Sequence, residues 1–134
     1  MRAANRLSGR RIALLLGAAL AGCGGGVYVG YGFDGSVDRA PAVALTASAT
    51  EAVPGAIVRL AAAASDDFGV DHVDFLRRDA AGHDTLLVAD RTEPYQTDVT
   101  IPPSPAGSVL RYVARAVDAA GQSTTSAPVD ITVR

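Results

Sequence analysis

Residues 109–117 have the sequence VLRYVARAV, in which apolar and charged side chains alternate. Successive side chains of an extended chain point to opposite faces, so residues two apart share a face. One face of this segment carries only apolar side chains, namely Leu110, Tyr112, Ala114 and Ala116. The opposite face carries Arg111 and Arg115. This pattern predicts a strand that is buried on one face and wet on the other.

The same alternation recurs on both sides of this segment, from Pro41 to the last residues. Turn residues separate the alternating segments, as in Asp79-Ala80-Ala81-Gly82, and no segment has the 3.6-residue period of a helix. Prolines at 102, 103 and 105 end one of the segments, because proline cannot donate to a ladder. We therefore predict an all-β sandwich of two sheets, with seven strands at residues 42–47, 56–64, 70–78, 85–89, 95–101, 109–117 and 129–133.

The period also predicts which side chains of the other strands are buried. Arg59 and Asp74 are expected to face water. Many of the positions expected to face inward are alanine, which predicts a thin core and modest stability. These inward positions are Val43, Leu45, Val58, Leu60, Ala62, Ala64, Val73 and Phe75.

Four motifs of this region resemble the bacterial immunoglobulin-like (Ig-like) domains found in surface and secreted proteins. They are ARAVDAAG (114–121), DHVDFLRR (71–78), the turn Glu93-Pro94-Tyr95 and SAPVDITV (126–133). The resemblance implies an Ig-like domain at residues 41–134, with Tyr112 as a candidate for a tyrosine corner. The disulfide and the buried tryptophan typical of antibody domains are missing. The fold by itself implies no particular function.

The first 22 residues have the organisation of a secretory signal peptide. Residues 1–11 carry four arginines and no acid, residues 12–20 are apolar, and two small residues, Ala21 and Gly22, follow. A membrane-spanning helix needs about 20 apolar residues, so nine are too few for a permanent anchor. We expect residues 1–22 to be cleaved.

The segment Leu20-Ala21-Gly22-Cys23 resembles the lipobox of bacterial lipoproteins at all four positions. The resemblance implies that Leu20, Ala21 and Gly22 form the recognition sequence. It also implies that Cys23 becomes the first residue and carries acyl chains such as palmitate. Two or more acyl chains anchor a protein stably in a membrane, whereas one does so only marginally. Gly24, in place of aspartate, favours the outer membrane, with the domain facing the periplasm or the cell surface. The alternative is an ordinary signal peptide with a coincidental cysteine.

Residues 23–40 are rich in glycine and are interpreted as a flexible tether. The stretch 27–33, VYVGYGF, spaces apolar and aromatic residues with glycine. It leaves two other interpretations open, namely an edge strand that pairs with a partner and a set of rings at the lipid interface.

Charge and cysteine content exclude several classes of function. All fourteen acidic residues but only eight of the twelve basic residues follow Cys23, which gives the mature chain a net charge of −6. Nucleic acid is therefore not an expected partner. Cys23 is the sole cysteine, so neither a disulfide within the chain nor a cysteine metal cluster can form.

Three aspartates are weak candidates for a calcium site. Asp66, Asp67 and Asp118 follow two strands whose ends lie at the same end of an Ig-like sandwich. Convergent carboxylates suit Ca²⁺. The other interpretation is ordinary turn chemistry, because DDFG and DAAG are not recognisable calcium loops. No cofactor is expected, and Ca²⁺ is the one candidate ligand.

No catalytic residues are identified. His72 and His83 have no acid or second imidazole at ligand spacing and are expected to be solvated, and neither GxSxG nor a phosphate-binding glycine loop is present. We expect a membrane-anchored envelope lipoprotein that binds or scaffolds an envelope protein or glycan. The alternatives are an architectural spacer without its own ligand and a small envelope enzyme.

Overall fold

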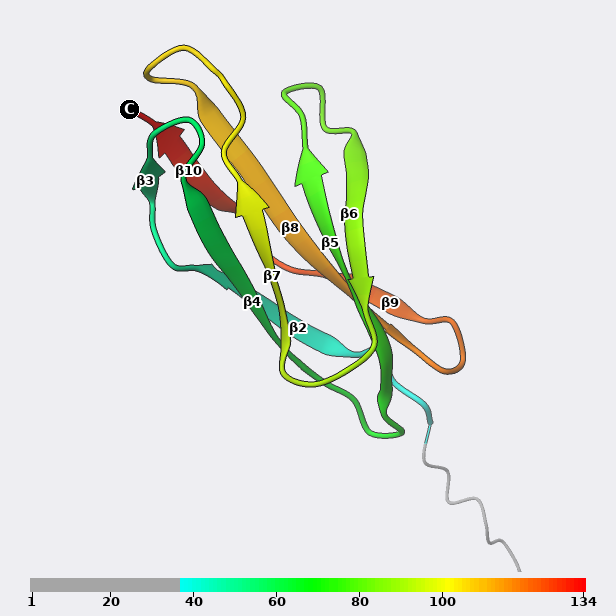
Figure 1. Cartoon of the computed structure of the whole chain (residues 1–134). Helices are drawn as coiled ribbons and strands as arrows, with labels where there is room; N and C mark the ends of the chain where they lie inside the picture. Colours follow the sequence, from blue (N-terminus) through cyan, green and yellow to red (C-terminus); the bar gives the residue numbers. More distant parts are fainter. Residues whose placement is uncertain (1–36) are drawn as a thin grey trace, which may run out of the picture. The chain divides into compact units, whose positions relative to one another are not determined.

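The computed structural model describes residues 37–134, and within this range the chain forms nine strands and no helix. Residues 38–134 form one compact unit. The predicted fold class, an all-β Ig-like sandwich of two sheets, is confirmed (Figure 1).

The smaller sheet has three antiparallel strands in the order β2-β4-β7. The larger sheet has the order β3-β10-β8-β5-β6, with the short β9 paired to the end of β8. Its pairs are antiparallel except β3 with β10, which is parallel. The bounds are β2 Ala42–Ala47, β3 Glu51–Ala52, β4 Ile57–Ser65, β5 Val70–Arg78, β6 Asp84–Asp90, β7 Tyr95–Thr100, β8 Val109–Asp118, β9 Ser123–Thr125 and β10 Val129–Val133.

Seven of the nine strands coincide with the predicted ones to within one residue at each end. The other two, β3 and β9, have only two and three residues. Segments so short contain too few positions to show an alternating pattern, so the sequence gives no sign of them. Both are held by pairing with a longer strand, β10 for β3 and β8 for β9.

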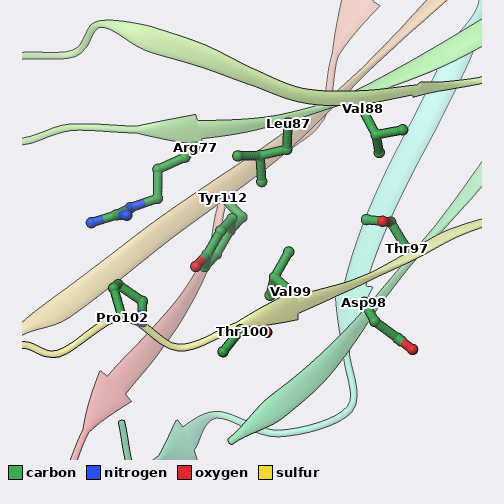
Figure 2. Close-up of a pocket in the computed structure, with 9 residues that line it drawn as sticks. All are labelled: Arg77, Leu87, Val88, Thr97, Asp98, Val99, Thr100, Pro102 and Tyr112. Carbon is green, nitrogen blue, oxygen red and sulfur yellow. The ribbon is translucent and has the colours of Figure 1, made fainter. Parts of the chain in front are cut away.

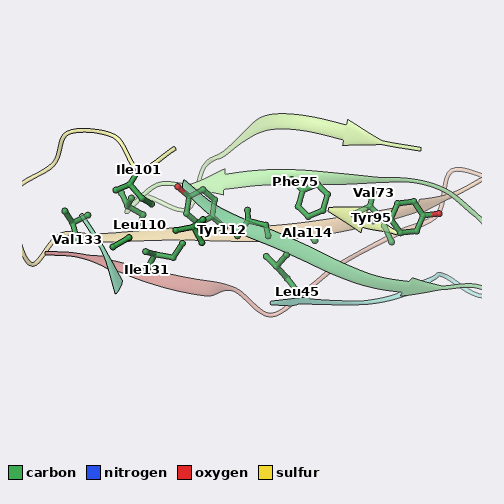
Figure 3. Packing of buried hydrophobic residues seen from close by; sticks show 14 residues of the cluster. Leu45, Val73, Phe75, Tyr95, Ile101, Leu110, Tyr112, Ala114, Ile131 and Val133 are labelled. Atoms are coloured by element: carbon green, nitrogen blue, oxygen red, sulfur yellow. The ribbon is translucent and has the colours of Figure 1, made fainter. Parts of the chain in front are cut away.

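The core lies between the two sheets and follows the period-two pattern (Figure 3). Phe75, Tyr112 and Tyr95 are its aromatic members, and aliphatic side chains from both sheets surround them. Ala62 and Ala64, predicted to face inward, pack against the core while staying partly exposed. The alanines of β4 bury less apolar area than larger side chains would, which limits their contribution to stability.

The outer face of the larger sheet differs from the prediction. Asp74 was expected to face water, but it is only 7% exposed. Arg115 stands opposite it in the β5–β8 pairing and covers its carboxylate. Leu76 and Val113, a second opposed pair on this face, are buried as well. Long arginine side chains cover neighbouring apolar groups with their methylenes, so this face is only partly wet.

Candidate functional site

One end of the sandwich gathers three chain segments that lie far apart in the sequence. Ala42 pairs with Ser65 across β2 and β4, and Val70 pairs with Asp118 across β5 and β8. The chain entering β2, the β4–β5 loop and the β8–β9 loop therefore meet at the same end (Figure 1). This is the end that the sequence predicted for its acidic loops.

Four aspartates lie on these segments, and we call them the acidic end: Asp38, Asp66, Asp67 and Asp118. One carboxylate oxygen from each of Asp38, Asp66 and Asp67 lies within 4.8 Å of the other two. Asp118 is 4% exposed and stands beside this group, where its charge acts on Asp38.

Two carboxylates of the acidic end use one oxygen to hold their own loop. Asp66 Oδ2 accepts a hydrogen bond from the Phe68 amide at 2.9 Å. Asp118 Oδ1 accepts hydrogen bonds from the Ala120 and Gln122 amides at 2.9 and 2.8 Å. The second oxygens, Asp66 Oδ1 and Asp118 Oδ2, are buried and have no hydrogen-bond partner among the described residues. Such unpaired buried oxygens are uncommon, because most buried polar atoms are satisfied.

The electrostatics of the acidic end disfavour a further negative charge. Desolvation and then the charge of Asp118 raise the pKa of Asp38 above its ordinary value, and the charges of Asp66 and Asp67 act in the same direction. A hydrogen bond with the Gln122 side chain opposes the rise in pKa. The three charges acting on Asp38 are all negative, so a bound cation would stabilise this group.

Sequence reasoning identified three of the four aspartates and missed Asp38, which it assigned to the tether. The sequence indicates the position of Asp38 only indirectly, through its distance from the neighbouring strand. Asp38 stands four residues ahead of β2, and the partner strand β4 ends one residue before Asp66. Only the register between β2 and β4 shows that the two carboxylates meet.

The two histidines have different environments. His83 has a side chain that is 82% exposed, as expected. The solvated interpretation of His72 is wrong, because its side chain is 18% exposed and its Nδ1 lies 2.7 Å from Asp71 Oδ2. Arg91 Nη1 donates to the same oxygen at 2.6 Å. The hydrogen bond from His72, followed by that from Arg91, lowers the pKa of Asp71.

A second feature is a groove between the free edges of the two sheets, which we call the edge groove. Leu87 and Val88 from β6, Val99 from β7 and Tyr112 from β8 all line it (Figure 2). The volume of the groove is about 300 Å³. All residues of β6 before Asp90 are exposed, including the adjacent apolar residues Leu86, Leu87 and Val88. The edge groove is thus bordered by an edge strand that pairs with β5 on one side only and has exposed apolar side chains.

Tyr112 forms part of the edge groove, and its role in a tyrosine corner stays a prediction. Burial raises the pKa of the Tyr112 phenol, and the positive charge of Arg77 opposes the rise. The ring belongs to the core while the residue also lines the groove.

The lipobox residues Leu20, Ala21, Gly22 and Cys23 and the signal peptide lie outside the described residues, as does most of the tether. Among the residues that are described, no helix is long and apolar enough to cross a membrane.

Comparison with known proteins agrees with the observed architecture. A sequence profile described as a bacterial Ig domain matches residues 41–133. The fold is similar to the fibronectin(III)-like modules of CbhA from Clostridium thermocellum. That alignment has a TM-score of 0.56 and 22% identity, and it covers 69% of this chain and 94% of the module. CopC from Methylosinus trichosporium OB3b aligns with a TM-score of 0.38 and 19% identity, over 69% of this chain and 93% of that chain. No curated protein matches the chain.

Proposed function

The chain belongs to the bacterial Ig domain family, and from this membership we propose that it is a lipid-anchored binding module of the cell envelope. Domains of this family are typically extracellular or associated with the envelope, and they are generally not catalytic. An Ig-like domain of this kind supports a role in binding or scaffolding. The proposal adds an anchor and a binding surface to that general role.

The proposed anchor is Cys23. It follows a nine-residue apolar run and completes the sequence Leu20-Ala21-Gly22-Cys23. As the sole cysteine of the chain, it has no partner for an internal disulfide. Acylation of Cys23 would hold the domain at the membrane, with the outer membrane as the proposed location.

The observation that carries the proposed binding role is the free edge of β6 beside the edge groove. An edge strand presents unpaired backbone amides and carbonyls, and proteins usually protect such an edge with charges, proline or a covering element. Here the middle of the strand is Leu86-Leu87-Val88, and all three side chains are exposed. This arrangement suits an extended segment of an envelope protein that adds to the sheet as a further strand.

Crosslinking in living cells tests the proposed surface. A photoreactive residue at Leu87 is compared with one at Ile57, an exposed apolar residue on β4 of the other sheet. We expect crosslinks to one envelope protein from Leu87 and none from Ile57. A synthetic peptide covering the crosslinked segment should then slow hydrogen exchange of the β6 amides. Equal crosslinking at both positions, or none at either, would overturn the proposed surface and favour an architectural spacer.

A further inference from the structure

The acidic end concentrates negative charge that the described chain does not neutralise. Six of the eight arginines in the described chain form ion pairs elsewhere, such as Arg91 with Asp71 and Arg115 with Asp74. At the acidic end, by contrast, the charges that act on Asp38 come from three other aspartates. Like charges held this close raise the free energy of the folded domain unless a cation joins them.

A buried carboxylate oxygen of Asp118 without a hydrogen-bond partner is a second, independent observation that points to a bound cation. Asp118 is 96% buried, as its 4% exposure shows, and its Oδ1 is already occupied by two backbone amides. Its Oδ2 has no partner, although it is shielded from solvent. Asp66 repeats the arrangement, with Oδ2 bonded to its loop and Oδ1 buried and unpaired. Burial of an unpaired carboxylate oxygen is costly, and a metal ion is one of the few partners that would satisfy such an oxygen.

From these observations we propose that the acidic end is a Ca²⁺ site, formed by Asp38, Asp66 and Asp67 with Asp118 beside them. The donor atoms identified are all carboxylate oxygens, which are the ligands that Ca²⁺ prefers. Ligands lie about 2.3–2.6 Å from Ca²⁺, so opposite ligands are about 5 Å apart. The 4.8 Å limit on the three oxygens fits within that span. Mg²⁺ is disfavoured, because it requires a smaller and strictly octahedral shell.

The ion has a defined structural effect at this position. Its three ligands join the segment that leads into β2, in the smaller sheet, to the β4–β5 loop, which connects the two sheets. Binding should therefore stabilise the folded domain, because the unfolded chain does not hold the four aspartates together. The site depends on neither the lipid anchor nor the edge groove.

The test is isothermal titration calorimetry of the detergent-solubilised full chain with CaCl₂, up to about 5 mM, because extracellular modules bind Ca²⁺ with dissociation constants of about 0.1–1 mM. Thermal unfolding is recorded in CaCl₂, in MgCl₂ and in EDTA. The main variant is Asp67→Asn, since Asp67 is exposed and asparagine has nearly the same size, so the substitution should not damage the fold. The matched control is Glu51→Gln, which removes one negative charge at the opposite end of the sandwich.

We expect one Ca²⁺ per chain, a higher melting temperature in CaCl₂ than in EDTA, and at least a tenfold weaker affinity in Asp67→Asn. Glu51→Gln should bind as the wild type does. The proposal is overturned if no binding heat appears and the melting temperature is the same in CaCl₂ and EDTA. An equal loss of affinity in both variants would also overturn it, since that result indicates general charge screening. Equal affinity for Mg²⁺ would overturn the assignment to calcium.

Discussion

Arg115 stands directly opposite Asp74 in the β5–β8 pairing, and two of its nitrogens donate to the same carboxylate oxygen. Nε lies 3.2 Å and Nη2 2.9 Å from Asp74 Oδ2. The side chains are 40% and 9% exposed, respectively. Arg59 and Asp98 form a similar opposed pair on the smaller sheet, where the side chains are 56% and 45% exposed. The two pairs join the same residue types but differ in burial and in geometry, because Arg59 donates to both carboxylate oxygens of Asp98.

The buried pair should contribute more to stability than the exposed one. In Arg115→Met the carboxylate of Asp74 loses its arginine partner while it stays covered, with His72 Nε2 still 3.5 Å from its other oxygen, and we expect the free energy of unfolding to fall by about 2 kcal/mol. Arg59→Met is the matched control and should change stability much less, because water replaces the lost partner of Asp98. Urea denaturation of both variants measures the difference. An equal fall in the free energy of unfolding in Arg115→Met and Arg59→Met would show that burial of Asp74 has no energetic consequence.

The Tyr112 ring, and not its hydroxyl, should stabilise the domain. Tyr112→Phe keeps the buried ring and removes only the hydroxyl of a residue that lines the edge groove, so we expect a change below about 0.5 kcal/mol. Tyr112→Ala leaves a cavity in the core and should cost about 3–5 kcal/mol. Chemical denaturation of the two variants measures both values. A large loss in Tyr112→Phe would indicate that the hydroxyl has a structural partner after all.

Acid should destabilise the domain through its cross-strand ion pairs. Hydrogen bonds from Arg59 and Arg111 lower the pKa of Asp98 and Asp130, respectively, below the ordinary value of 3.8. Such groups stabilise the fold above pH 3.8, and this contribution is lost as the pH falls through the lowered pKa. We therefore expect the melting temperature to fall steeply below about pH 4. The decline of the melting temperature with falling pH should be shallower in Asp98→Asn. An identical pH dependence in that variant would show that the Arg59–Asp98 pair does not cause the acid sensitivity.

Asp38 should destabilise the folded domain when it is charged, in contrast to Asp98 and Asp130, which stabilise it. Its pKa is raised in the folded state, so its charge destabilises the fold once the pH exceeds that raised value. In EDTA at pH 7, Asp38→Asn should therefore melt at a higher temperature than the wild type, and the difference should vanish near pH 3. In CaCl₂ the order should reverse, because the variant lacks a proposed ligand. Thermal unfolding under the three conditions measures this, and a variant that is less stable in EDTA at pH 7 would contradict the prediction.

The proposed anchor predicts a change in detergent partitioning. Wild-type protein from its bacterial host should enter the detergent phase of a temperature-induced phase separation. Cys23→Ser removes the acylated thiol, so this variant should enter the aqueous phase. Gly24→Ala leaves the lipobox sequence intact and serves as the control. Unchanged partitioning of Cys23→Ser would exclude lipidation of this residue.

Side-chain period was sufficient to predict the strands and most of the core, because the faces of a strand follow directly from its sequence. Leu110, Tyr112 and Ala114 are buried as their spacing predicts. Asp74 shows the limit of this reasoning, since the period gave its face correctly but did not show that Arg115 covers it.

The acidic end could be predicted only in part. Asp66 and Asp118 follow strands whose place in an Ig-like sandwich is known in advance. Asp38 joins them through the register of β2 against β4, which no local pattern encodes. The environment of His72 was misjudged as well: its neighbour Asp71 accepts from it, and the contact of Asp71 with Arg91 depends on how β5 meets the loop after β6.

The parallel pairing of β3 with β10 determines how the domain responds to mechanical tension. The described chain enters at the acidic end and leaves at the opposite end, beyond Val133 (Figure 1). A pull on the two ends therefore acts along the strands, in opposite directions on β3 and β10. Their hydrogen bonds, including Thr132 N to Thr50 O and Arg134 N to Ala52 O, are then loaded together in shear, whereas peeling would break them one at a time. A domain held at the membrane by one end and by a partner elsewhere would resist extension through this short pair.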